Sequence, residues 1–268
     1  MSPDTRAGNW DACAGYHYDD TTLKGFSHTH LSGTGCIDLG DILFRPTTLK
    51  PDLTAESICR PANFSHKDER ASAGYYSVIL KDEGIKAELT ATTHTGMHRY
   101  TFPSGKPVTI IVDLAHLLDN EYIYEAELER TTSNEIVGMR RTRGWTDNQY
   151  VYFAAQFSEP FQTVEFVQDK KIVSAETKQV GTDLQAILTF ADKDGEPIIA
   201  KVGLSLVSVD NARKNLAEEV KDFNFDAVCA AARNDWEQAL SSITVEGGGT
   251  DDLKNFYTAI YHAMVVPN

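Results

Sequence analysis

No apolar stretch in this sequence reaches the about eighteen residues that a helix needs to cross a bilayer, and its start lacks a basic segment followed by an apolar one. We therefore expect no membrane span and no targeting segment. Clustered basic residues are also lacking, and the formal net charge over 268 residues is −14. Because nucleic-acid binders neutralise phosphates with clustered Lys and Arg, no nucleic-acid partner is expected.

Cysteine is scarce and widely spaced. No C-x-x-C pair occurs, so a zinc site is not predicted. One or two disulfides or free buried thiols are equally compatible with this count, because pairing cannot be deduced from sequence. The four cysteines are Cys13, Cys36, Cys59 and Cys229.

What the sequence does have is alternation. Between about residues 74 and 209, apolar and polar residues alternate in short runs, which is the period of half-buried strands. Turn-forming segments at 82–84 and 192–195 separate some of these runs. This pattern predicts a mainly β fold, a large antiparallel β-sandwich, rather than a parallel α/β fold. The predicted strands are residues 75–80, 85–92, 98–102, 108–112, 135–140, 150–157, 183–190 and 198–205.

The pattern changes to a helical one at Asp210. Asp210 or Asn211 can cap a helix over 212–221, and a second helix follows residues 224–226. Three glycines at 247–249 precede a third helix, opened by Asp251 and Asp252, with an apolar face. That face has no partner in the remaining sequence, so we expect the chain to be part of a longer protein. The residues of the face are Phe256, Tyr257, Ile260, Tyr261 and Met264.

Residues 10–41 combine aromatic rings, imidazoles, thiols and glycines too densely for an ordinary core strand. The glycines allow sharp turns or a close approach of the backbone to a ligand. Tyr and His side chains supply flat ring faces and hydrogen-bonding groups that can bind a sugar. We predict that this segment forms a binding surface.

Three stretches of this segment closely resemble the amino-terminal domain of the glycoside hydrolase family 92 α-mannosidases. They are GYHY at 15–18, GFSHTHLSGTGC at 25–36 and DLGD at 38–41. Segments at 74–78, 88–92, 98–103, 201–208 and 256–262 are similar to later motifs of that family, so the resemblance covers nearly the whole chain. It implies a β-sandwich domain over 1–209, a helical linker over 210–246 and, over 247–268, the first helix of an (α/α)6 barrel that is otherwise missing.

The resemblance also implies an activity for the whole protein. It would be a calcium-dependent, inverting exo-α-mannosidase that removes terminal mannose from N-glycans or mannans, using a carboxylic acid to protonate the leaving oxygen and a carboxylate to activate water. The family draws both groups, and most calcium ligands, from the barrel. No catalytic residue and no metal ligand is therefore assigned here, and the chain by itself is expected to be inactive and to pack against its own C-terminal barrel. A periplasmic, secreted or cell-surface location is implied.

The sandwich would contribute one wall of the sugar pocket. The predicted substrate-binding residues are Trp10, His30, Ser32, Gly33, Thr34, Gly35 and Cys36. Trp10 could instead pack in the core, and Cys36 could be an inert buried thiol or pair with Cys13.

Two other patterns in this segment have structural explanations. His28 and His30, two residues apart, would share one face of a strand, as metal ligands can. Without a third ligand we expect one structural imidazole and one pocket wall. The aspartates beside turns could suggest a glycosidase carboxylate pair, but such residues usually accept hydrogen bonds from backbone amides. These aspartates are Asp11, Asp19, Asp20, Asp38 and Asp41.

Two further functions remain open from the sequence. The chain could be a freestanding carbohydrate-binding sandwich whose terminal helices pack back on it. It could also be a structural domain whose exposed helix face mediates oligomerisation.

Overall fold

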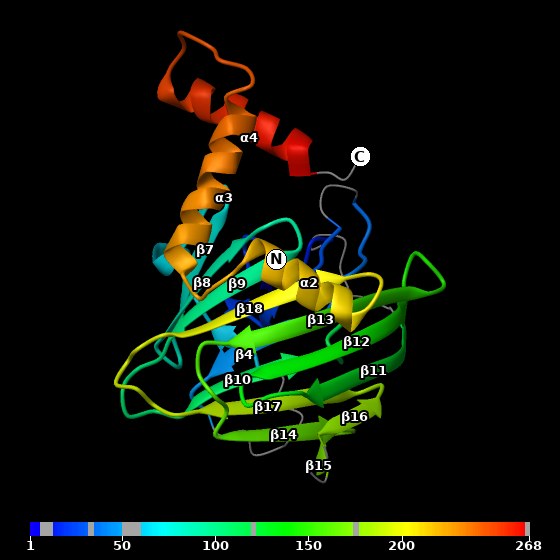
Figure 1. Cartoon of the computed structure of the whole chain (residues 1–268). Coiled ribbons are helices and arrows are strands. Elements are labelled where there is room, and N and C mark those ends of the chain that lie inside the picture. The colour runs from blue at the N-terminus through cyan, green and yellow to red at the C-terminus, as the bar shows by residue number, and fades with distance from the viewer. Residues whose placement is uncertain (6–12, 32–34, 50–59, 119–121, 174–176, 266–268) are drawn as a thin grey trace.

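The computed structural model describes residues 1–5, 13–31, 35–49, 60–118, 122–173 and 177–265. Two large antiparallel sheets face each other and form a β-sandwich, with helices late in the chain (Figure 1). The prediction of a mainly β sandwich is therefore confirmed.

The first sheet has seven described strands. Their order is β1 (Ser2–Asp4), β3 (Gly25–Ser27), β4 (Leu43–Thr47), β10 (Val108–Asp113), β17 (Leu184–Phe190), β14 (Thr163–Gln168) and β15 (Lys171–Val173). The short N-terminal strand β1 thus forms one edge of this sheet, where it pairs with β3.

The second sheet has nine described strands. Their order is β16 (Lys178–Gly181), β11 (Tyr122–Arg130), β12 (Glu135–Arg143), β13 (Gln149–Phe157), β18 (Ile198–Ser205), β9 (Thr95–Thr101), β8 (Ile85–Ala91), β7 (Tyr75–Leu80) and β6 (Glu69–Ser72). A separate pair consists of β2 (Thr22–Leu23) and β5 (Ala62–Asn63).

The core lies between the two sheets and is rich in aromatic side chains. Successive side chains of a strand point to opposite faces, so every second residue points into this core, and this period predicted several of the strands. Side chains of this kind each contribute about 1.5–3 kcal/mol when they leave water. Fully buried phenylalanines include Phe26, Phe44, Phe153, Phe157, Phe166 and Phe190.

Helix α2 (Val209–Glu219) covers the outer face of the second sheet, against β18 and β13. Gly203 permits this packing, because a Cβ there would overlap the Ala212 carbonyl and the Leu216 side chain. The predicted cap is wrong: Ser208, not Asp210 or Asn211, is the N-cap, and its Oγ accepts the Asn211 amide at 3.1 Å. The helix begins three residues earlier than predicted, so Asp210 and Asn211 lie within its first turn.

The two remaining helices form an arm that projects from the sandwich (Figure 1). In α3 (Phe225–Leu240), the Asn224 side chain caps the N-terminus by accepting the Ala227 amide at 3.1 Å. In α4 (Thr250–Val265), no side chain is buried. The rings of Trp236 and Tyr261 meet with centroids 4.8 Å apart and join the two helices. None of the described helices has the length and apolar character to cross a membrane.

Candidate functional site

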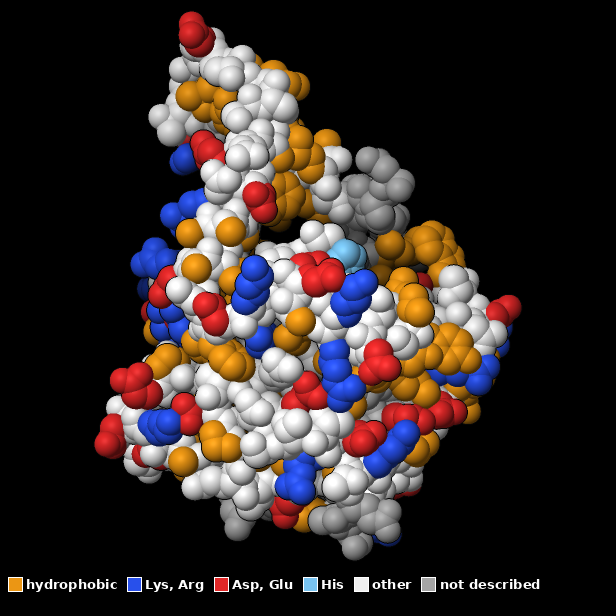
Figure 2. Space-filling model, viewed as in Figure 1, with side chains coloured by type: hydrophobic (Ala, Val, Ile, Leu, Met, Phe, Trp, Pro, Cys, Tyr) orange, Lys and Arg blue, Asp and Glu red, His pale blue; other side chains and the backbone are white. Residues whose placement is uncertain are grey.

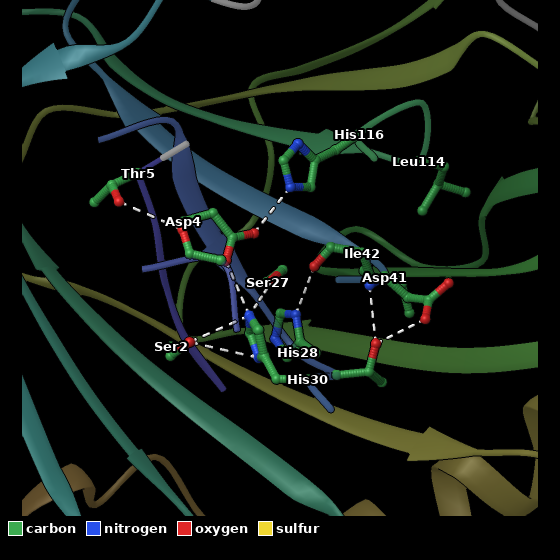
Figure 3. Close-up of polar contacts among 12 residues, drawn as sticks. Ser2, Asp4, Thr5, Ser27, His28, His30, Asp41, Ile42, Leu114 and His116 are labelled. Atoms are coloured by element: carbon green, nitrogen blue, oxygen red, sulfur yellow. Dashed lines mark hydrogen bonds and ion pairs between the residues drawn. The ribbon is translucent and has the colours of Figure 1, made fainter. Parts of the chain in front are cut away.

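Asp4, on β1, is completely buried and organises two imidazoles (Figure 3). The Nε2 of His30 donates to its Oδ1 and the Nε2 of His116 to its Oδ2, both at 2.9 Å. Because a carboxylate only accepts hydrogen bonds, these contacts place a proton on each Nε2. Gly15 lies against this carboxylate with φ +84°, and a Cβ there would overlap it. A glycine is therefore required in the GYHY motif for steric reasons.

The ionised state of Asp4 is strongly favoured. Burial alone would raise the pKa of its carboxyl, but the charges and hydrogen bonds of His30 and His116 outweigh burial and hold the pKa well below its usual range. His30 Nε2 also lies 2.8 Å from Ser27 Oγ and 3.2 Å from Ser2 Oγ. Three side chains of β1 and β3, namely Ser2, Asp4 and Ser27, thus contact the same nitrogen of His30 (Figure 3).

A buried ion pair connects the turn after His30 to the second sheet. Arg140 Nε donates to Asp41 Oδ1 at 2.7 Å, and neither side chain is exposed to solvent. The other oxygen of Asp41 accepts the Thr29 hydroxyl at 2.7 Å. Arg140 Nη1 donates to the backbone carbonyl of His116. The same guanidinium therefore supports both the turn at Asp41 and the segment that carries His116.

The turn itself has an unusual backbone. Leu39, Gly40 and Ile42 have φ angles of +71°, +83° and +58°. For a β-branched residue such as Ile42, this conformation is disfavoured, with a cost of order 1–3 kcal/mol. The Ile42 carbonyl accepts a hydrogen bond from His28 Nδ1 at 2.6 Å. Contacts of this kind and the buried ion pair hold the turn in place.

A chain of hydrogen bonds continues from His28 into the core. His28 Nε2 lies 2.9 Å from His98 Nε2, and His98 Nδ1 lies 2.7 Å from the Tyr100 hydroxyl. Since the Ile42 carbonyl can only accept, one assignment satisfies all three bonds: Tyr100 donates to His98, His98 donates to His28, and His28 donates to Ile42. Burial lowers the pKa of His28 to about 3 and that of His98 well below its usual value. Both imidazoles are neutral.

The two histidines of the segment therefore have separate environments. The spacing argument placed them on one strand face, but β3 ends at Ser27, before either residue. His28 turns into the core and His30 turns to Asp4. This agrees with the expectation of one structural imidazole, which is His28.

The predicted site residues are only partly described. Trp10, Ser32, Gly33 and Thr34 lie outside the described residues. Gly35 is exposed with φ +71°, and Cys36 is half-buried. His30, by contrast, has a nearly buried side chain.

Of the five turn aspartates, Asp11 lies outside the described residues, and Asp38 and Asp41 make different contacts. Asp38 accepts the backbone amides of Leu39 and Trp145 at 2.9 and 3.3 Å, as expected for an acidic residue beside a turn. Asp41 forms the ion pair with Arg140, which the turn explanation did not include.

Sequence reasoning also missed Asp4, His116 and Arg140. No local pattern marks them, because Asp4 and His116 are 112 residues apart and meet only through the sheet. Their partners lie on three separated segments of the chain.

A groove of about 940 Å³ borders this cluster. It lies between the sheet edges formed by β1 and β6 and the arm helix α4, and Figure 2 shows the surface hollowed where the arm meets the sandwich. Ser2, which contacts His30, lines the groove together with Tyr16, Tyr18, His66 and Glu69. A volume of this size is in the range of small-molecule binding sites.

The described residues do not by themselves fit a calcium site. Among them, no three His, Cys, Asp or Glu side chains are grouped so that they could hold a metal ion. The carboxylate of Asp4 is already occupied by two N–H donors.

Comparisons with known proteins cover the whole chain. The sequence model of the glycosyl hydrolase family 92 N-terminal domain matches residues 1–205, and that of the family 92 catalytic domain matches residues 211–268. A solved family 92 α-mannosidase from Bacteroides thetaiotaomicron, in complex with mannoimidazole, is 36% identical with a TM-score of 0.91, over 98% of this chain and 36% of that one.

Two other relatives are more distant in sequence. A family 92 inverting mannosidase from Bacteroides thetaiotaomicron is 25% identical with a TM-score of 0.86, over 100% of this chain and 35% of that one. An uncharacterized secreted glycosidase of Arthroderma benhamiae is 26% identical over 284 residues, which cover 94% of this chain and 36% of the relative. The chain thus spans about a third of the length of these relatives.

Proposed function

Because the chain belongs to glycosyl hydrolase family 92, we propose that it is the sugar-binding sandwich of an exo-acting, inverting α-mannosidase. The whole protein would hydrolyse terminal α-linked mannose of N-glycans or mannans. Two solved relatives that match nearly the entire chain are mannosidases, one of them an inverting enzyme.

The position of His30 carries this proposal. It is fixed by Asp4 on the buried side and reaches Ser2, which lines the large groove. With Nε2 engaged by Asp4, Nδ1 is the nitrogen left to form a hydrogen bond with a sugar hydroxyl. We propose that His30, Gly35 and Cys36, with Trp10 and residues 32–34, form one wall of the mannose pocket.

In this proposal the catalytic acid and base are supplied by polypeptide other than these 268 residues. An inverting glycosidase needs two carboxyl groups on opposite sides of the scissile bond, separated by about 6.5–9.5 Å. The described groove contains Glu69, which already accepts hydrogen bonds from Tyr16, Tyr76 and His66. Glu69 is therefore better suited to hold its neighbours than to exchange a proton with substrate.

Calcium dependence is also part of the proposal. A hard divalent cation prefers oxygen ligands and can bind sugar hydroxyls. Its ligands would come mainly from outside this chain, and its role would lie in holding the terminal sugar.

The relatives suggest where the protein acts and how its parts fit. A relative named as a secreted glycosidase supports a secreted, periplasmic or cell-surface location. The exposed α4 helix, which falls in the segment similar to the family's catalytic domain, would pack against the protein's own C-terminal barrel.

Hydrolysis assays test this division of labour. The whole protein should release mannose from an aryl α-mannoside in the presence of calcium and lose that activity with a chelator. The chain of residues 1–268 alone should release none, even with added calcium. Turnover by this chain alone would refute the proposal. Saturable binding of mannobiose by the chain, with no hydrolysis by the whole protein, would favour a freestanding carbohydrate-binding module instead.

A further inference from the structure

Tyr18 and His66 form a flat ring pair on the wall of the groove. Their ring centroids are 4.1 Å apart and their planes differ by 8°, so one face of Tyr18 is covered by the imidazole. Tyr18 is nonetheless 66% exposed. Its opposite face is therefore open to solvent, and it is already oriented by the stack.

His66 is fixed more firmly than an ordinary surface residue. Its Nδ1 lies 2.6 Å from Glu69 Oε2, and the buried ring of Phe64 meets it edge to face at 5.4 Å. The hydrogen bond to Glu69 raises the pKa of His66 above its usual value. An imidazole held in this way gives Tyr18 a rigid backing.

Glu69 links this pair to two further tyrosines. Its Oε1 accepts the Tyr76 hydroxyl at 2.6 Å, and its Oε2 accepts the Tyr16 hydroxyl at 3.1 Å. Burial, followed by the neighbouring Glu69, raises the pKa of both phenols, so both stay protonated and remain donors. The four side chains around Glu69 thus form one fixed unit along the groove.

An open aromatic face beside hydrogen-bonding groups suits a sugar. The C–H face of a pyranose packs on such a ring while its hydroxyls meet polar groups at the rim. Across the groove, α4 contributes Tyr261 and His262. Among the described residues that line the groove, the one carboxylate, Glu69, is already engaged by three donors and is not free to bind a cation.

We call the stacked Tyr18–His66 pair the platform. Tyr18 is mostly exposed in the groove, whereas His30, which contacts the groove residue Ser2, has a nearly buried side chain. An exo-acting enzyme needs a closed end for the terminal sugar and an open side for the rest of the glycan. Building on the proposed function, we propose that Tyr18, backed by His66, binds a sugar unit on the leaving-group side of the scissile bond.

The test compares two substrates of the whole protein. One is α-mannosyl fluoride, whose leaving group is a single atom, and the other is an α-mannotriose of the linkage that the wild type cleaves best. Tyr18→Ala should lower the ratio of kcat/KM for mannotriose to that for mannosyl fluoride about tenfold, because only mannotriose reaches the platform. Tyr18→Trp should retain the ratio within about twofold, since an indole offers a similar face.

A control is available among the residues that do not line the groove. Tyr122, on β11, is 60% exposed and is also part of an aromatic pair, with Tyr124 at 5.1 Å. Tyr122→Ala should leave the ratio at the wild-type value. Thermal unfolding of all three variants verifies that they fold.

The outcomes separate this inference from the proposed function. An unchanged ratio in Tyr18→Ala, or an equal loss of kcat/KM with both substrates, contradicts the proposed role of Tyr18 but not the proposed mannosidase function. If the wild type hydrolyses neither substrate, the proposed function fails. Calorimetry then measures the affinity for mannotriose to test whether Tyr18 binds sugar. In that case, equal affinity of wild type and Tyr18→Ala overturns the platform as a sugar-binding surface.

Discussion

Arg140 illustrates how much of the site depends on single buried residues. Its guanidinium reaches Asp41 and the backbone carbonyls of Leu114 and His116 without any exposure to solvent. A buried charge is tolerated only when it is paired, so loss of one partner leaves the other uncompensated.

Arg140→Met should lower the free energy of unfolding by about 3–5 kcal/mol, because Asp41 would lose its buried partner. Urea denaturation of wild type and variant measures the difference. The neighbouring Arg143→Met is the control: Arg143 is 61% exposed and faces an exposed Asp147, so its loss should change stability by less than about 0.5 kcal/mol. Similar effects of the two substitutions would contradict this account.

Asp4 makes stability dependent on pH in the acidic range. Its pKa is lowered in the folded state relative to about 3.9 in the unfolded chain. The stabilisation is therefore fully present above about pH 5 and is lost as the pH falls through the unfolded and then the folded pKa. Asp4→Asn should be clearly less stable than wild type at pH 7, and the gap should narrow at pH 3. Denaturation curves at both pH values measure it, and a gap that stays constant would argue against an ionised Asp4.

The pKa values of His28 and His66 should be shifted in opposite directions from that of a free histidine. The buried His28 has a pKa of about 3, whereas the pKa of His66 is raised by its hydrogen bond to Glu69. Nitrogen NMR of the imidazoles at pH 5 should show His28 neutral with its proton on Nδ1 and His66 fully protonated. Because the unfolded chain protonates His28 near pH 6.5, this residue reduces stability as the pH falls below that value. A protonated His28 at pH 5 would exclude the hydrogen-bond chain through His98.

At the level of secondary structure elements, the cap of α2 is a specific test of local geometry. Ser208→Ala removes the side chain that accepts the Asn211 amide and should cost about 1 kcal/mol of stability. Asp210→Ala, at a position where the side chain is 93% exposed, should cost less than about 0.5 kcal/mol. Thermal or urea unfolding distinguishes the two. If Asp210→Ala lowered stability more than Ser208→Ala, Asp210 would be the N-cap, as the sequence predicted.

The strands differ in how well they can be predicted from the sequence. The alternation in the sequence predicted β7 and β18 with the same bounds that the structure gives them. Strand β4 was not predicted, whereas β10, which is also buried at every residue, was. The sequence of β10, VTIIVD, is rich in the β-branched residues that favour strands, but that of β4, LFRPT, contains Arg and Pro. Strand β11 was missed because Glu125, Glu127 and Glu129 favour helices in isolation, and only its pairing with β12 and β16 makes it a strand.

At the level of the whole molecule, the helical arm is the part least supported by the sandwich. Residues 241–249, which join α3 to α4, are almost all exposed. Exposed, weakly packed connections are preferred sites of proteolysis. Brief digestion with a glutamate-specific protease should therefore cut after Glu246 before any glutamate of the described strands. Glu246→Gln should remove this first cut, which mass spectrometry detects; earlier cleavage within β8, at the buried Glu88, would show that the sandwich opens more easily than the arm.

The sequence by itself determined the fold class and the family. Period-two alternation is a local property of each strand, and the glycine-rich motifs at 15–41 are contiguous, so both can be seen without the structure. His30 could be named from the sequence for the same reason.

Only the tertiary structure decided what holds His30 and what surrounds it. Asp4, His116 and Arg140 come from distant segments, and the Tyr18 platform depends on His66 and Glu69 from a different part of the chain. Hydrogen bonds and ring stacking act over a few ångströms, so they depend on which strands become neighbours. That is set by the burial of the whole core and leaves no local pattern in the sequence.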